Sequence, residues 1–143
     1  MTPVYILILL TSNTVICDAD SDCFYVPDCL QKEAFYPALI VLSCTGATKA
    51  DLDSMRLVAD SLHLILTSCH NSRNHRDMRK NDNDILKTLE KLVTKHNVDP
   101  TRIFIYGFSG MGVQALLAVF MHPLNFRGAI AVCGHKGAIP YAN

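Results

Sequence analysis

RIFIYGFSGMG, residues 102–112, runs from an apolar, β-branched segment into a corner made of serine and glycines, and VQALLAVF follows at once. A continuous apolar run of this length is typical of a buried strand, and the longer run after the corner has the length of a helix. Small residues at such a corner let a strand and a helix pass close together. The stretch predicts a buried strand, a tight turn at Ser109 and a helix.

Strand-like and helix-like segments alternate along the rest of the chain. The expected strands are residues 36–43, 62–68, 102–108 and 127–133. The expected helices are residues 51–62, about 83–96 and 112–122. This order predicts an α/β fold, with a mostly parallel sheet and flanking helices.

Each expected helix has a face that we expect to be buried. The apolar positions of the first are Leu52, Met55, Val58, Ala59 and Leu62, and those of the second are Ile85, Leu86, Leu89, Leu92 and Val93. Asn81, Asp82 and Asp84 suit the start of the second helix, and Asn97 suits a left-handed closing residue. The third helix is apolar nearly all round, so we expect it to be central and buried, with Pro123 ending it.

Several reactive side chains stand where the expected strands end. They are Ser43, Cys44, Cys69, Ser109 and Cys133. Because the carboxyl ends of parallel strands share one edge of the sheet, where such folds bind ligands, we expect these residues to gather there.

Length and charge limit the classes of function. The chain has 143 residues, enough for one domain, with 13 basic and 13 acidic side chains. A zero net charge and the absence of tryptophan give no reason to expect a nucleic acid partner. We expect no transmembrane segment, because the apolar run Val4–Leu10 is far shorter than the about 20 residues that span a bilayer.

The N-terminus has the pattern of a secretory signal. The apolar run Val4–Leu10 is followed by small and polar residues, with a candidate cleavage site after Ala19. We therefore expect residues 1–19 to be a signal peptide and the protein to be secreted or periplasmic. In the alternative interpretation the run is a buried strand and the protein is cytoplasmic. Lipid modification of Cys17 is not expected, because Ile16 is too large for that processing.

The six cysteines are interpreted by position. No pair has the spacing of a zinc site, so no structural metal is expected. The thiols at strand ends are interpreted as buried and inert. In an exported protein Cys23 and Cys29 could form a local disulfide.

The sequence resembles the α/β-hydrolase superfamily, in its esterase, dienelactone-hydrolase and depolymerase-like branches, from about Phe24 to Gly137. The stretches that carry the resemblance are FYVP (24–27), FYPALIVLSCTG (35–46), NVDPTRIFIYGFSGMG (97–112) and FRGAIAVCG (126–134). By this resemblance they contain the second and third strands, the nucleophile elbow and the sixth strand. The third and fourth strands would then be neighbours, and so would Cys44 and Cys69.

The resemblance also implies an activity. Ser109 would be the nucleophile of a serine hydrolase that cleaves an ester or amide bond through a serine ester intermediate. The amide of Gly110 would be one oxyanion donor, and Thr45 or Cys44 would supply the second. The implied substrate is a small-molecule or polymeric ester, and no metal or organic cofactor is implied.

The sequence departs from the family pattern in three ways. Met111 stands where the family has a small residue, and Ser43–Gly46 replaces the usual His-Gly-x-Gly of the oxyanion loop. The family's acid and histidine come after the sixth strand. We therefore expect residues 20–143 to be an incomplete α/β-hydrolase domain, truncated after about the sixth strand and inactive alone. His135 follows the sixth strand but lacks later strands to position it, whereas His122 and His63 are interpreted as structural.

The same residues allow two alternative functions to be compared with hydrolysis. The first is a non-catalytic binding module that keeps the fold and an apolar pocket, which Met111 and the altered oxyanion loop favour. The second is nucleotide binding at GFSGMG, which fails because Ser109 replaces the middle glycine of the dinucleotide fingerprint. The basic run 69–80 is interpreted as a solvated loop, or else as the rim of a pocket for an anionic group.

Overall fold

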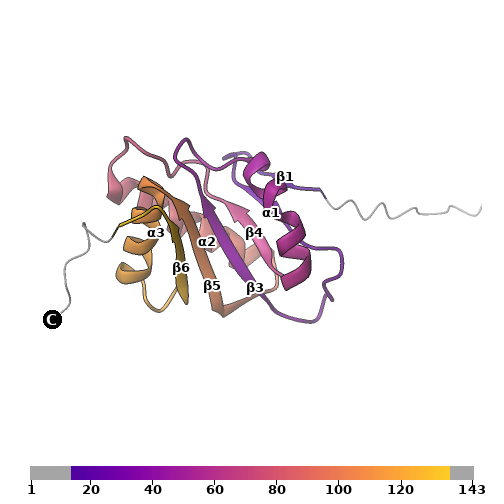
Figure 1. Cartoon of the computed structure of the whole chain (residues 1–143). Helices are drawn as coiled ribbons and strands as arrows, with labels where there is room; N and C mark the ends of the chain where they lie inside the picture. The colour runs from indigo at the N-terminus through magenta and orange to yellow at the C-terminus, as the bar shows by residue number, and fades with distance from the viewer. Residues whose placement is uncertain (1–13, 136–143) are drawn as a thin grey trace, which may run out of the picture.

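The computed structural model describes residues 14–135, which form a mixed six-stranded sheet with helices packed on it (Figure 1). The strands are β1 (Ile16–Cys17), β2 (Cys23–Tyr25), β3 (Tyr36–Leu42), β4 (Ile65–Ser68), β5 (Val98–Phe108) and β6 (Gly128–Val132). The helices are α1 (Lys49–Leu62), α2 (Met78–Lys95) and α3 (Gly110–Met121). The apolar run Val4–Leu10 lies outside the described residues.

The strands lie in the order β1-β2-β4-β3-β5-β6, which confirms the predicted α/β class. β3 pairs in parallel with β4 and β5, and β5 pairs in parallel with β6, whereas β1 and β2 run antiparallel. The apolar run of β3 explains its central place, because Ile40, Val41 and Leu42 are each at most 1% exposed. A strand covered on both faces needs this continuous apolar sequence.

The two faces of the sheet carry different helices. Leu39 and Val41 of β3 belong to the core cluster that includes Leu52 of α1. Ile40 and Leu42 belong to the cluster that includes residues of α2 and α3. Neighbouring residues of a strand point to opposite faces, so α1 covers one face and α2 and α3 cover the other. The parallel strands therefore end at one edge between these layers.

The helix faces differ in part from the prediction. In α1, Leu52 and Ala59 are fully buried, but Val58 and Leu62 are 57% and 61% exposed. In α3, buried residues alternate with exposed Phe120 and Met121, so this helix is not buried all round. A helix can pack on a sheet through one narrow stripe of its surface. The positions of apolar residues in the sequence did not show which residues form that stripe.

Several element ends also differ. α2 begins at Met78 because the side chain of Asp77 accepts hydrogen bonds from the amides of Arg79 and Lys80. Asn81, which was expected at the start, is buried within the helix. His63 is the left-handed cap of α1 (φ 51°), so β4 begins two residues later and not at residue 62. The cap of α2 is His96 in an extended conformation, and β5 begins at Val98, so the predicted closing role of Asn97 is wrong.

The N-terminal part adds a short hairpin that the sequence did not predict. Cys17 and Cys23 face each other across β1 and β2 and form a disulfide, while Cys29 is a free thiol. The expected Cys23–Cys29 pair is therefore wrong. Cleavage after Ala19 would remove β1 and this disulfide with it.

Within residues 14–135, no helix combines the length and apolarity needed to span a bilayer.

Candidate active site

Ser109 lies at the corner between β5 and α3 in a strained backbone conformation. Its φ is 54° and its ψ is −122°, a combination that residues other than glycine rarely adopt and that costs about 1–3 kcal/mol. The residue is partly exposed, and its amide donates to the carbonyl oxygen of Val132 at 2.8 Å. Ser109 occupies the N-cap position of α3, yet its hydroxyl accepts no capping hydrogen bond from that helix. Its side chain is therefore not used to stabilise α3.

The residues around Ser109 explain how the corner is made. A methyl group built on Gly107 would lie only 2.0 Å from the carbonyl oxygen of Met111, so β5 and α3 approach too closely for any side chain at Gly107. The Met111 side chain points away into the core, where it is 3% exposed and receives a hydrogen bond from Ser72 Oγ at 3.7 Å. Met111 therefore does not occupy the corner, although its size departs from the expected pattern.

The ends of the parallel strands gather around this corner, as predicted. Cys44 Sγ donates to the carbonyl oxygen of Phe108 at 3.2 Å, which brings the loop after β3 beside Ser109. The amide of Cys69 donates to the carbonyl oxygen of Val41 at 3.1 Å. Cys133 follows β6, whose last residue accepts the Ser109 amide.

The candidate oxyanion donors differ in how firmly they are placed. Gly110 is the first residue of α3, where the amide has no partner within the helix and the helix dipole favours negative charge. Thr45 is exposed in a turn that closes with a 3.0 Å hydrogen bond from the Gly46 amide to the Ser43 carbonyl. The structure thus brings Cys44 into contact with the end of β5 and places Thr45 one residue further along the loop.

Asn74 is a site residue that the sequence analysis missed. Its amide donates to the carbonyl oxygen of Cys44 at 3.0 Å. Its side chain lies against Gly110, where an added methyl group would come 2.4 Å from Asn74 Oδ1. Asn74 is within a loop of mixed polar residues, and no sequence signal distinguishes it from Asn71 in the same loop.

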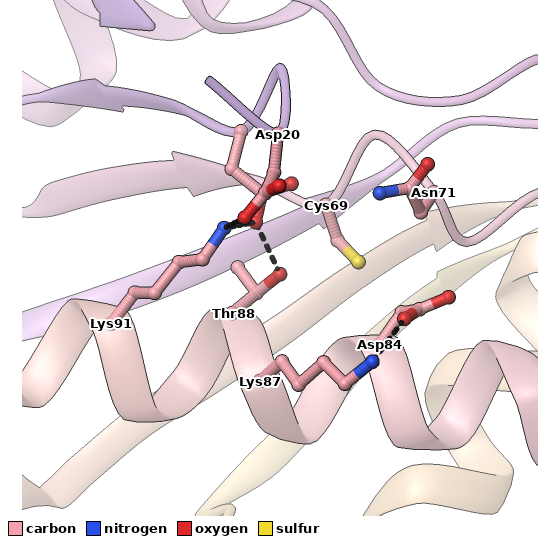
Figure 2. A pocket seen from close by; sticks show the side chains of 8 residues that line it. Asp20, Cys69, Asn71, Asp84, Lys87, Thr88 and Lys91 are labelled. Carbon is pink, nitrogen blue, oxygen red and sulfur yellow. Dashed lines mark hydrogen bonds and ion pairs between the residues drawn. The ribbon is translucent and has the colours of Figure 1, made fainter. Parts of the chain in front are cut away.

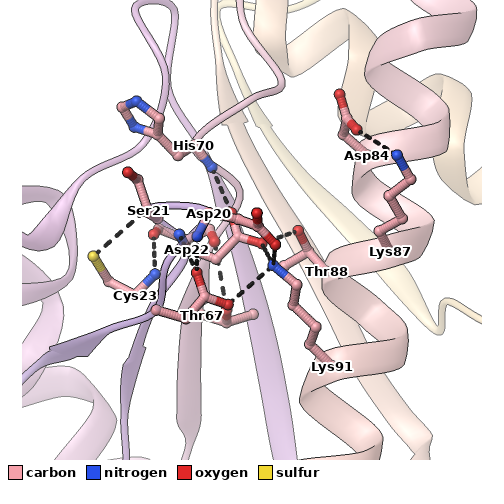
Figure 3. Close-up of polar contacts among 12 residues, drawn as sticks. Asp20, Ser21, Asp22, Cys23, Thr67, His70, Asp84, Lys87, Thr88 and Lys91 are labelled. Atoms are coloured by element: carbon pink, nitrogen blue, oxygen red, sulfur yellow. Dashed lines mark hydrogen bonds and ion pairs between the residues drawn. The ribbon is translucent and has the colours of Figure 1, made fainter.

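A buried carboxylate holds the loop that carries Asn74 (Figure 3). Asp22 is 3% exposed, and it accepts hydrogen bonds from the amide of His70 at 3.0 Å, from Thr88 Oγ1 at 2.9 Å and from Lys91 Nζ at 3.0 Å. Lys91 also pairs with Asp18 and Asp20, at 2.9 Å and 2.8 Å. Burial lowers the pKa of Lys91, but these three carboxylates outweigh it and raise the pKa above its ordinary value. The network joins the β1–β2 turn, the end of β4 and α2.

A small cavity of about 120 Å³ lies beside this network (Figure 2). Its lining residues are Asp20, Asp22, Cys69, Asn71, Asp84, Lys87, Thr88 and Lys91. Lys91 pairs with Asp20, and Lys87 pairs with Asp84, within the lining itself. The cavity wall includes neither Ser109 nor the candidate oxyanion donors, so we do not assign the cavity to the candidate active site.

The cysteines at the sheet edge are not joined by a disulfide. Cys44 and Cys69 follow neighbouring strands but form no disulfide, since both are free thiols. Cys69 is fully buried, and burial raises the pKa of its thiol to about 11. This agrees with the interpretation of Cys69 as an inert core residue, whereas the expectation of burial is wrong for Cys133, which is exposed.

The basic loop and the histidines make mostly structural contacts. Arg76 pairs with Asp84 at 2.6 Å, while the other basic side chains of residues 73–80 are exposed. His122 Nε2 lies 2.8 Å from Asp82 Oδ2, an arrangement that resembles part of a catalytic relay. However, His122 caps the far end of the 12-residue α3, about 20 Å along the helix from Ser109. This pair therefore lies too far away to activate Ser109.

Across residues 14–135, no group of three or more His, Cys, Asp or Glu side chains is arranged to hold a metal ion.

Comparisons with known proteins find a related family and related folds. A sequence model of the prolyl oligopeptidase family matches residues 69–138, which include the Ser109 corner. Curated protein sequences contain no match to the chain.

Three solved structures are similar in fold, each at 18% sequence identity. They are a thermostable esterase (TM-score 0.62, 84% of this chain), a protein from Bacteroides ovatus assigned as a dipeptidyl aminopeptidase IV (0.62, 77%) and an acetyl xylan esterase from Aspergillus awamori (0.68, 91%). The chain spans 39%, 18% and 54% of the lengths of these proteins, respectively.

Proposed function

We propose that this chain, which has the α/β-hydrolase fold, carries the nucleophile and the oxyanion donors of a serine hydrolase that acts on an ester or amide bond. The fold is established by the strand order and by the similarity to solved esterase structures. The observation that carries the proposal is the backbone of Ser109. A non-glycine residue held at φ 54° and ψ −122° is costly, and such strain is concentrated at functional sites.

In this mechanism Ser109 Oγ attacks the substrate carbonyl carbon and loses its proton to a base, and the carbonyl oxygen becomes an oxyanion. The Gly110 amide and an amide of Cys44 or Thr45 donate hydrogen bonds to that oxygen. Collapse of the intermediate expels the alcohol or amine and leaves a serine ester, which water then hydrolyses. The proposal places the activating histidine and carboxylate outside residues 14–135.

The structure removes one argument for a binding module that lacks catalysis. That alternative was favoured by Met111, whose size suggested crowding of the corner. Because the Met111 side chain is buried in the core, the corner is compatible with a reactive serine. We propose a small-molecule or polymeric ester as substrate.

The proposal is tested by ester cleavage in the full-length protein. Hydrolysis of p-nitrophenyl acetate is compared for the wild type, Ser109→Ala and the control Ser61→Ala, which alters an exposed serine of α1. Loss of the nucleophile is expected to lower kcat/KM by about a thousandfold or more, with the control unchanged. Equal turnover by Ser109→Ala would remove the nucleophile assignment.

We also propose that the protein is exported to the periplasm or secreted. The Cys17–Cys23 disulfide supports this, because disulfides persist mainly in oxidising compartments. Retention of the disulfide requires any signal cleavage to occur before Cys17. N-terminal sequencing of the mature protein distinguishes such a cut from cleavage after Ala19, and recovery of the full chain from the cytoplasm would contradict export.

A further inference from the structure

We propose that Asn74 is a positioning residue that fixes the two halves of the oxyanion site relative to each other. One half is the amide of Gly110, and the other is the loop of Cys44 and Thr45. The inference rests on the proposed function, because the separation of these donors matters for catalysis only if Ser109 attacks a carbonyl. Asn74 is the residue whose contacts reach both halves.

The first contact is with α3. A methyl group on Gly110 would lie 2.4 Å from Asn74 Oδ1, 3.1 Å from Cγ and 3.2 Å from Nδ2. Gly110 is the first residue of α3, and the Asn74 carboxamide fills the space that a side chain at Gly110 would need.

The second contact is with the loop after β3. The Asn74 amide donates to the carbonyl oxygen of Cys44 at 3.0 Å, and Cys44 Sγ in turn donates to the carbonyl oxygen of Phe108 at 3.2 Å. The loop is thus tied to the end of β5 directly and to the start of α3 through Asn74. The main chain of Asn74 thus holds the loop of Cys44 and Thr45, and its side chain sets the space between that loop and the start of α3.

Buried groups hold Asn74 itself in place. Asn81 of α2 is 1% exposed, and its side chain accepts from the Arg73 amide at 3.2 Å and donates to the Arg73 carbonyl oxygen at 2.9 Å. Asp22 accepts the amide of His70 at 3.0 Å, as Figure 3 shows. Both sides of the segment 70–74 are therefore anchored to the core, which is what a positioning residue needs.

The chemistry sets the expected effect of losing Asn74. Oxyanion donors act when they lie about 2.7–3.1 Å from the developing charge, and a misplacement of about 1 Å can cost about a hundredfold in rate. Asn74→Ala keeps the main-chain hydrogen bond to Cys44 but opens the space beside Gly110, so the start of α3 can shift relative to the loop. Because the oxyanion forms only in the reaction, this change should lower kcat about tenfold and leave KM nearly unchanged.

The test combines this variant with its partner position in the full-length protein. The rate of Ser109 phosphonylation by a fluorophosphonate and the kcat and KM for p-nitrophenyl acetate are measured for Asn74→Ala, Gly110→Ala and the double variant. Asn71→Ala, in the same loop, is the matched control. Gly110→Ala should slow phosphonylation at least about tenfold, since its methyl group displaces Asn74. The same change made in the Asn74→Ala background should have little further effect.

Two results would overturn the inference while leaving the proposed function intact. One is wild-type kcat in Asn74→Ala, and the other is an equal effect of Gly110→Ala in both backgrounds. A wild-type protein in which Ser109 is not phosphonylated would overturn the proposed function, and the positioning role with it. The free energy of unfolding in urea is also measured for the two single variants and the double variant. This shows whether the two positions are coupled in stability as well as in catalysis. Coupling in stability with no change in kcat would make Asn74 a purely structural residue.

Discussion

The strained backbone of Ser109 predicts that glycine stabilises the corner. At φ 54° and ψ −122° the conformation costs a non-glycine residue about 1–3 kcal/mol, and glycine adopts it without a clash. Glycine in turn loses about 0.4–1 kcal/mol through the greater freedom of the unfolded chain. Ser109→Gly should therefore be more stable than Ser109→Ala by about 1 kcal/mol, although both variants lack the nucleophile.

Urea denaturation of the full-length protein measures this difference, and Ser54 provides the matched control. Ser54 is exposed within α1, where glycine should instead be less stable than alanine by about 0.5–1 kcal/mol. The account thus predicts opposite signs at the two positions. If Ser109→Gly were less stable than Ser109→Ala, the Ser109 backbone would not be strained, and the main argument for a functional serine would be lost.

Three further predictions concern the core and the N-terminal network. Asp22→Ala should lower the free energy of unfolding by about 2–3 kcal/mol, because the His70 amide and the Thr88 hydroxyl lose their acceptor while Lys91 keeps Asp18 and Asp20. The change of exposed Asp28 to alanine should alter it by less than about 0.5 kcal/mol in the same urea titration. Burial raises the pKa of Asp18, but the hydrogen bond to Lys91 and the positive charge of Lys91 have a larger, opposite effect. The pKa of Asp18 is therefore below its ordinary value. The stabilisation from Asp18 is therefore complete above about pH 4 and lost as the pH falls through the lowered value, and Asp18→Asn should lose less stability than the wild type between pH 5 and pH 2. Iodoacetamide at pH 8 should modify exposed Cys29 and leave Cys69 unmodified until the protein unfolds, as peptide mass spectrometry would show; early modification of Cys69 would contradict its burial.

The sequence predicted those features that arise from local pattern. The apolar run of residues 102–108 and the glycines around Ser109 predicted a strand, a corner and a helix in that order. These features depend on the spacing of apolar residues and on small side chains, which can be seen in neighbouring residues. The gathering of strand ends at one edge followed from the parallel sheet. Cys44 therefore lies beside the end of β5, next to Ser109, as the sequence predicts.

The features that were missed depend on contacts between distant residues. Asn74 meets Gly110 across 36 positions, and Asp22 meets His70 across 48, so no local pattern marks either of them. The disulfide of Cys17 with Cys23 depends on a hairpin of two short strands, too short to show a period. The exposed faces of α1 and α3 were missed because apolar residues on a helix do not show how wide the contact with the sheet is.

The most direct test of the account is the site of covalent labelling by a fluorophosphonate in the full-length protein. Peptide mass spectrometry should find one phosphonyl group on Ser109, and prior unfolding in urea should abolish the labelling, because the reactive corner exists only in the folded protein. Labelling of a different serine, with Ser109 unmodified in a protein that cleaves esters, would contradict the central claim that the corner after β5 holds the nucleophile.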